Sequence, residues 1–97
     1  MKTANEYLVL IREFMKQNAE KYGIMSMGIF GSVARNEQSD NSDLDIFVEL
    51  READPFIMGF IHDDLENICK CNIDLIRLRK GLNSLLLKRI EHDAIYA

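Results

Sequence analysis

Two aspartates one residue apart are the first candidates for chemistry in this sequence. Asp43 and Asp45 enclose Leu44, at the start of a segment that alternates apolar and polar residues as a β-strand does. Side chains two positions apart on a strand point to the same face, with Cα atoms about 7 Å apart. Their oxygens suit a hard cation such as Mg²⁺, which keeps coordination positions that substrate phosphates can fill. A solvated strand face is the alternative that this spacing leaves open.

A third aspartate stands inside another apolar run. Asp74 lies among isoleucines and a leucine in the segment 72–78, which we predict to be a strand. Aspartate is depleted in strands, so a carboxylate in this setting needs a partner. The alternative for Asp74 is an exposed position on an edge strand.

A glycine-serine turn is the candidate for phosphate binding. Gly31 and Ser32 follow the short apolar run 24–30, and Arg35 comes one helical turn later. Glycine lets the backbone approach an anion, and the serine hydroxyl can donate a hydrogen bond to it. The planar guanidinium of arginine can donate two parallel hydrogen bonds to a phosphate. The sequence contains neither G-x-x-x-x-G-K-[ST] nor G-x-G-x-x-G. An ordinary strand-to-helix turn remains the alternative.

The elements around these residues can be read from hydrophobic spacing. The first segment has helical spacing of its apolar residues, a capping box of Thr3 and Glu6, and Gly23 as a stop. A buried strand over 24–30 follows, and then a short helical turn and a loop over 32–42. In the strand 44–50 we expect one buried face and one polar face, the buried one made of Leu44, Ile46, Val48 and Leu50 and the polar one of Asp43, Asp45, Phe47 and Glu49.

The second half of the chain continues the alternation of helices and strands. Asp54 and Pro55 form a helix start, and the helix after them carries an apolar stripe of Phe56, Ile57, Phe60, Ile61, Leu65 and Ile68. After the strand 72–78 we predict a last helix over 82–90 and a short extended end over 94–97. The leucines at 85–87 leave apolar surface for a partner. This order predicts a layered α/β fold in a single domain, residues 1–97.

Composition limits the classes of function. The chain has 97 residues and a net charge of −4, which argues against extended nucleic-acid binding, since that needs many lysine and arginine contacts to phosphates. It has no apolar window of ~18 residues and no signal-peptide pattern, so we expect a cytoplasmic protein without membrane contact.

The remaining metal-ligating residue types form no recognised pattern. Cys69 and Cys71 are spaced C-x-C, which we interpret as two inert thiols. His62 and His92 are far apart in sequence and are expected on the surface or at helix flanks. His62, Asp63 and Asp64 should fan apart on a helix as a solvated face.

The motifs taken together are more specific than any one of them. Residues 31–35 read G-S-V-A-R, residues 42–46 read S-D-L-D-I, and Asp74 follows in a third strand. This combination resembles the minimal nucleotidyltransferase (MNT) family of the DNA polymerase beta-type superfamily, over nearly the whole chain. The resemblance implies a small polymerase-beta-like fold with a mixed β-sheet packed with helices. Asn36 stands where the family usually has glycine, and asparagine tolerates positive φ better than most residues.

The resemblance also implies the chemistry of the site. Asp43, Asp45 and Asp74 would be the catalytic residues and would bind two divalent ions, Mg²⁺ or alternatively Mn²⁺. Gly31, Ser32 and Arg35 would bind the nucleotide, with ATP as the substrate. The reaction would be in-line transfer of AMP to a hydroxyl group.

In this family, short stand-alone chains are often antitoxins that transfer adenylate to a tyrosine of a HEPN-domain toxin. The resemblance therefore implies a protein adenylyltransferase with a HEPN partner. The alternative from another class is a non-catalytic module that neutralises such a partner by contact alone. Nucleotidyl transfer to a small molecule such as an aminoglycoside is a third alternative, disfavoured because those relatives carry a further substrate-binding domain.

Overall fold

The structure is a computed structural model that describes residues 1–97. Its elements follow the predicted order. They are α1 (Ala4–Tyr22), β1 (Ile24–Phe30), α2 (Gly31–Ala34), β2 (Leu44–Leu50), α3 (Pro55–Cys69), β3 (Ile73–Arg77), α4 (Ser84–Asp93) and β4 (Ile95–Tyr96). The last helix begins later than predicted because Asn83 caps it, accepting hydrogen bonds from the amides of Leu85 and Leu86, and it continues to Asp93. None of the helices is both long and apolar enough to cross a membrane.

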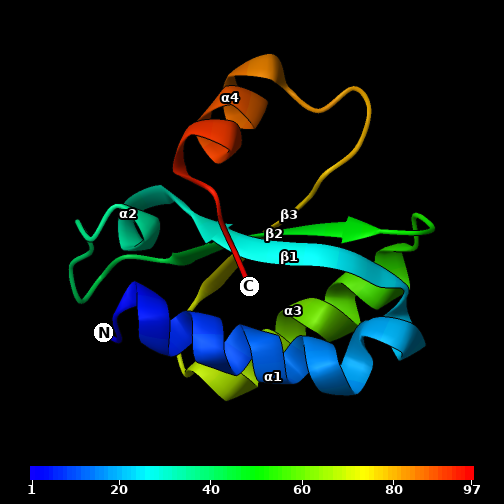
Figure 1. The fold of residues 1–97 in the computed structure, drawn as a ribbon, viewed down its shortest axis with the longest axis horizontal. Helices are drawn as coiled ribbons and strands as arrows, with labels where there is room; N and C mark the ends of the chain where they lie inside the picture. The colour runs from blue at the N-terminus through cyan, green and yellow to red at the C-terminus, as the bar shows by residue number, and fades with distance from the viewer.

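The four strands form one mixed sheet in the order β3-β2-β1-β4. β1 is antiparallel to both β2 and β4, whereas β2 and β3 are parallel. Parallel neighbours need a crossover, and α3 supplies it between β2 and β3. Figure 1 shows α1 and α3 under one face of the sheet and α4 over the other. The fold is therefore the mixed sheet packed with helices that the sequence resemblance implied.

The local signals at the helix ends are confirmed. Thr3 and Glu6 form a capping box at the start of α1, and Gly23 ends that helix in the left-handed conformation. The Asp54 side chain accepts hydrogen bonds from the amides of Phe56 and Ile57 at the start of α3. Each of these contacts spans no more than a few residues, which explains why they could be predicted.

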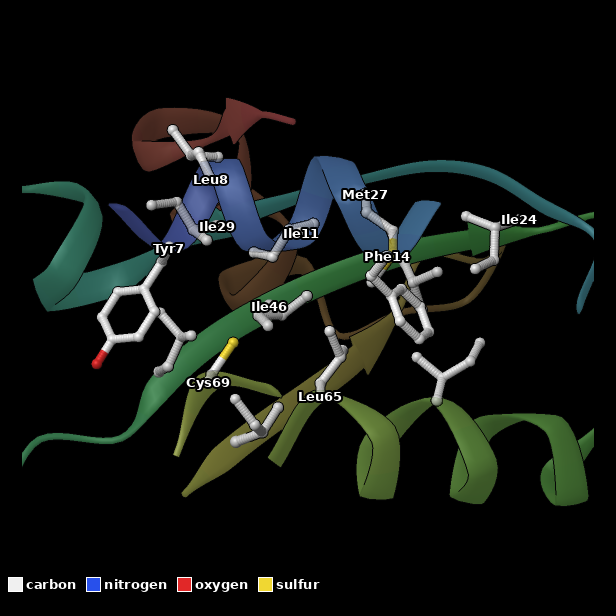
Figure 2. Packing of buried hydrophobic residues seen from close by; sticks show 14 of the residues in the cluster. Tyr7, Leu8, Ile11, Phe14, Ile24, Met27, Ile29, Ile46, Leu65 and Cys69 are labelled. Carbon is white, nitrogen blue, oxygen red and sulfur yellow. The ribbon is translucent and has the colours of Figure 1, made fainter. Parts of the chain in front are cut away.

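The larger core lies between the sheet and the helices α1 and α3. Figure 2 shows side chains from α1 meeting those from the strands and from α3 in this layer. Phe14 of α1 is 2% exposed and belongs to this layer. The residues that build this layer include Tyr7, Leu8, Ile11, Phe14, Met27, Ile29, Leu44, Ile46, Val48, Ile61, Leu65 and Cys69.

The prediction of a polar outer face for β2 is wrong at Phe47. This side chain is fully buried in a second cluster with Phe30 and Ile90, because α4 covers that face of the sheet. The Phe47 ring also lies over Gly28, where an added β-carbon would collide with it. The sheet is thus buried on both faces at its centre, and the polar side chains are left at its end.

The predicted apolar stripe of α3 is wrong at Phe56, Phe60 and Ile68, which are exposed. Phe56 is 77% exposed and Phe60 is 55% exposed, whereas Ile61 and Leu65 are buried. Positions 61 and 65 lie on one line along the helix, and Phe60 is about 100° away from it. Only the side of α3 that carries Ile61 and Leu65 packs against the sheet.

Candidate active site

The structure places Asp74 beside Asp45. β2 and β3 run parallel with these two residues as direct partners, and neighbouring strands are about 4.8 Å apart. Both side chains lie on the face that α4 covers, because Leu44, Ile46 and Ile73 occupy the opposite core. Asp43 comes directly before β2, two residues from Asp45. The third carboxylate, which sequence spacing alone could not position, is therefore a neighbour of the pair.

Burial and a neighbouring carboxylate dominate the electrostatics of Asp45. Burial, and then the nearby carboxylate of Asp74, raise the pKa of Asp45 to about 6, while Arg89 opposes the rise. None of the three aspartates takes part in an ion pair within the chain. Asp43 and Asp74 are exposed and Asp45 is half-buried, and the ligand atoms of the three do not all lie within 4.8 Å of one another. Neighbouring carboxylates without an ion-pair partner still suit a divalent hard cation, so Asp45 and Asp74 fit the metal that the sequence implies.

The glycine-serine turn meets the aspartates at the end of β1. Phe30, the last residue of β1, pairs with Asp45 across the sheet, and α2 begins at the next residue. Gly31 has a φ of +75°, and a β-carbon there would collide with Oδ2 of Asp45. Ser32 follows and is partly buried. Gly31 of the glycine-serine motif and Asp45 of the aspartate motif are therefore in direct contact.

Asn36 adopts the backbone conformation that suits glycine. Its φ is +59°, in the left-handed region that asparagine tolerates. Its amide donates to the carbonyl of Val33 and closes the turn after α2. The departure from the family motif at this position leaves the local backbone in place.

Arg35 is held by carboxylates of its own chain. Its Nε lies 3.1 Å from Glu37, and a second guanidinium nitrogen lies 2.6 Å from Asp93. The second contact ties the end of α2 to the end of α4. The predicted contact of Arg35 with a phosphate stays a prediction, and it requires the phosphate to share or replace these partners.

Sequence reasoning missed Arg89, a cation of α4 whose charge acts on this site. Arg89 acts on Asp45 as a positive charge, although the two residues are far apart in sequence. A single sequence carries no signal for this approach, because it depends on how α4 packs over the sheet. The consecutive basic residues Lys88 and Arg89 are visible in the sequence, but not the face they occupy.

The other candidate ligands lie elsewhere. Cys69 and Cys71 are free, and burial raises the pKa of the Cys69 thiol to about 11, as inert thiols require. His92 is exposed, as predicted. Asp64 does point away from His62, and it accepts a hydrogen bond of 3.0 Å from the Tyr22 hydroxyl.

The prediction that Asp63 points away from His62 is wrong. Its carboxylate lies 3.3 Å from Nδ1 of His62, and Glu66 lies 3.8 Å from the same nitrogen. These ligand atoms are close enough to share an ion. They belong to α3, on the face of the sheet opposite Asp45, and are therefore a group separate from the three aspartates.

Comparison with known sequences identifies relatives along the whole chain. The family described as "Polymerase beta, Nucleotidyltransferase" matches residues 11–96. A protein of Methanocaldococcus jannaschii assigned by name as a protein adenylyltransferase is 39% identical over 97 residues, 99% of each chain. The protein adenylyltransferase MntA of Thermococcus cleftensis is 30% identical, over 99% of this chain and 97% of its own.

Solved structures share the fold. A minimal nucleotidyltransferase superposes with a TM-score of 0.75 at 28% identity, covering 93% of this chain and 92% of its own. A toxin-antitoxin complex with AMP-PNP gives 0.75 at 21% identity, covering 91% of this chain and 69% of that one. A complex of a tri-AMPylated Shewanella oneidensis HEPN toxin with an MNT antitoxin gives 0.66 at 16% identity, covering 93% and 70%.

Proposed function

This chain belongs to the polymerase beta-type nucleotidyltransferase family, and from that premise we propose that it transfers AMP from ATP to a hydroxyl group of a protein. The acceptor is a tyrosine of a HEPN-type toxin, which the transfer inactivates, so the chain acts as an antitoxin. Relatives that span its whole length carry the name protein adenylyltransferase, which supports this reaction type.

The observation that carries the proposal is the meeting of Gly31, Asp45 and Asp74. A turn suited to phosphate and two carboxylates without counter-ions come from three separate segments and share one place on the sheet. A solvated strand face would not need glycine packed against one of its carboxylates. A structural turn would not need an aspartate pair beside it.

The carboxylates also define the metal requirement. Asp43, Asp45 and Asp74 would hold two Mg²⁺ ions, with Mn²⁺ as the alternative. Such ions, when bound, make the acceptor hydroxyl easier to deprotonate and neutralise charge on the triphosphate and on the leaving pyrophosphate.

The protein's own groups position the reactants. The backbone at Gly31 and the hydroxyl of Ser32 hold the nucleotide phosphates in line with the acceptor. The hydroxyl oxygen bonds to the α-phosphorus as the α–β anhydride bond breaks, and pyrophosphate leaves with the electron pair. Asp74 accepts the hydroxyl proton. The products are the adenylylated acceptor and pyrophosphate, so atoms and charge balance.

The partner supplies the acceptor. Structures of similar fold are described as toxin-antitoxin complexes, one of them with an AMPylated HEPN toxin, which supports this class of partner. On α4, Leu85 is 71% exposed and Leu87 is 36% exposed. These leucines provide the apolar surface predicted for a partner.

The test is label transfer to a purified HEPN partner in the presence of Mg²⁺. With ATP labelled at the α-phosphate, the toxin should become labelled, and with ATP labelled at the γ-phosphate it should not. EDTA should stop the transfer, and mass spectrometry should locate AMP on a tyrosine. If the partner is neutralised with no AMP attached and without ATP, the contact-only alternative is correct and the proposal is wrong.

A further inference from the structure

His62, Asp63 and Glu66 form a cluster of metal-ligating side chains on α3. His62 and Glu66 are four residues apart and share one side of the helix, as the paired ligands of helical zinc motifs do. The ligand atoms of all three side chains lie within 4.8 Å of one another. Figure 1 shows α3 on the face of the sheet opposite α4, so the cluster is separate from the candidate active site.

A hydrogen bond between His62 and β3 decides which ring nitrogen faces the carboxylates. Nε2 lies 3.0 Å from the carbonyl oxygen of Ile73, and a carbonyl can only accept, so Nε2 carries a proton. In the neutral imidazole, Nδ1 then has a free electron pair on the side of Asp63 and Glu66. Histidines that bind metals have this arrangement, because a carbonyl on the other ring nitrogen fixes the tautomer and orients the ring.

The cluster has no positive charge of its own when His62 is neutral. Neither Asp63 nor Glu66 forms an ion pair with a lysine or an arginine. Three electron-pair donors, two of them negatively charged, therefore meet at one place. Either a proton on Nδ1 or a bound cation would remove this repulsion.

The distances in the cluster favour a cation over a proton. Nδ1 lies 3.3 Å from the Asp63 carboxylate and 3.8 Å from that of Glu66, longer than the roughly 2.7–2.9 Å of a charge-assisted hydrogen bond. A tetrahedral ion with bonds of about 2.0–2.2 Å separates its ligand atoms by about 3.4 Å. His92 provides a contrast within the chain, because its Nδ1 lies 2.8 Å from Asp93, at the distance of a hydrogen bond.

We infer that His62, Asp63 and Glu66 bind one Zn²⁺ ion through Nδ1 and one oxygen of each carboxylate, with water as the fourth ligand. Zinc accepts nitrogen and oxygen ligands together, whereas Mg²⁺ prefers oxygen ligands in an octahedral shell. The bound ion stabilises the folded chain, and it holds the ring that joins α3 to the start of β3. The site goes beyond the proposed function, because none of its residues takes part in AMP transfer.

Calorimetric titration with Zn²⁺ at pH 7.5 tests the inference. The titrated chain carries Asp43→Asn and Asp45→Asn, which remove competing carboxylates of the candidate active site. It should bind one equivalent of Zn²⁺ at this cluster. Adding His62→Gln or Glu66→Gln should weaken that binding at least about tenfold, as expected on losing one of three protein ligands. Zn²⁺ should also raise the melting temperature, and either added substitution should remove most of that rise.

His92→Gln is the matched control, because His92 also lies beside an aspartate but belongs to no group of three ligands. This variant should retain the zinc affinity within about twofold. Cys71→Ser should retain it as well, which excludes binding through the partly exposed thiol. Circular dichroism should show an unchanged fold in every variant. In nitrogen NMR spectra, Zn²⁺ should shift the Nδ1 resonance of His62 while Nε2 keeps its proton.

Several outcomes would overturn the site. Equal zinc affinity with and without His62→Gln would do so, and so would zinc bound to Nε2 of His62 or to His92. If zinc binds only above about 1 mM, a proton on Nδ1 neutralises the cluster and the inference is wrong. Failure of AMP transfer by the original chain would refute the proposed function and leave this site unaffected.

Discussion

Gly31 lies against the carboxylate of Asp45, with no room for a β-carbon between them. The glycine adopts a φ of +75°, and Phe30 before it pairs with Asp45 across β1 and β2. The backbone of the phosphate-binding turn is thus packed on a metal-binding candidate. Substitution of the glycine should therefore disturb both parts of the site at once.

Gly31→Ala should weaken Mg·ATP binding much more than Ser32→Ala. The alanine β-carbon would displace the Asp45 carboxylate, and the left-handed backbone costs a non-glycine residue roughly 1–2 kcal/mol. Ser32→Ala removes only one hydroxyl donor, a loss of roughly 1 kcal/mol. Calorimetry on both variants, with melting temperature as the control for folding, checks this order. Equal affinities would show that the turn has only a structural role.

Asp43→Asn and Asp45→Asn should each reduce AMP transfer to background while the fold remains intact. An amide keeps the size of the side chain but removes the negative charge that a divalent cation needs. Label transfer to the partner, measured beside circular dichroism, tests this. The conservative substitution Glu49→Gln on the same strand is the control, because Glu49 is exposed and lies outside the candidate site. Transfer at the original rate in either aspartate variant contradicts the metal assignment.

In the metal-free protein, the contribution of Asp45 to stability should fall as pH rises from about 4 to about 6.5. The pKa of Asp45 is about 6 in the folded chain, against 3.8 for an ordinary aspartate. The folded state therefore holds the proton more tightly, and this stabilisation, complete below pH 3.8, is lost as pH rises through 6. Because the side chain is only half-buried, solvent screening leaves an effect of roughly 1 kcal/mol.

Other carboxylates titrate in the same pH range. The informative quantity is therefore the difference in free energy of unfolding between the original chain and the Asp45→Asn variant. Urea unfolding in EDTA should show Asp45→Asn gaining stability relative to the original chain between pH 4 and pH 7. Mg²⁺ at pH 7.5 should stabilise the original chain more than the variant. A difference that does not change with pH would contradict the assigned environment of Asp45.

Asp74→Asn should separate nucleotide binding from transfer. We expect Asp74 to act on the acceptor hydroxyl and not on the nucleotide. In the variant, Mg·ATP should therefore still bind through Asp43 and Asp45, while AMP transfer is lost. Inhibition of the toxin by the variant, with and without ATP, provides the second measurement. Full inhibition by Asp74→Asn without ATP would support neutralisation by contact and refute the enzymatic mechanism.

Cys69 should resist alkylation in the folded protein at pH 8. Its side chain is 1% exposed, and burial raises the pKa of its thiol to about 11, so little thiolate is available. Cys71 is only half-buried and should react first with iodoacetamide. Peptide mass spectrometry locates the label, and Cys71→Ser should remove the fast reaction. Rapid labelling of Cys69 without denaturant would contradict its burial.

The sequence by itself determined the features that depend on a few neighbouring residues. The caps at Thr3 and Asp54 formed as predicted because donor and acceptor lie within one helical turn. Asn36 adopts the left-handed backbone, which the glycine usual at this position in the family allows and which asparagine tolerates. The order of the elements and the bounds of β1 also followed from hydrophobic spacing.

Only the tertiary structure decided which of these elements meet. Burial of Phe47 depends on α4 packing over that face, and exposure of Phe60 depends on which line of α3 meets the sheet. Asp74 joins Asp45 only because β3 pairs in parallel with β2 in one register. The positive charge of Arg89 acts on Asp45 although the two residues are far apart in sequence. Spacing along a single chain carries no information on strand order or helix packing, because burial and pairing between distant segments decide both.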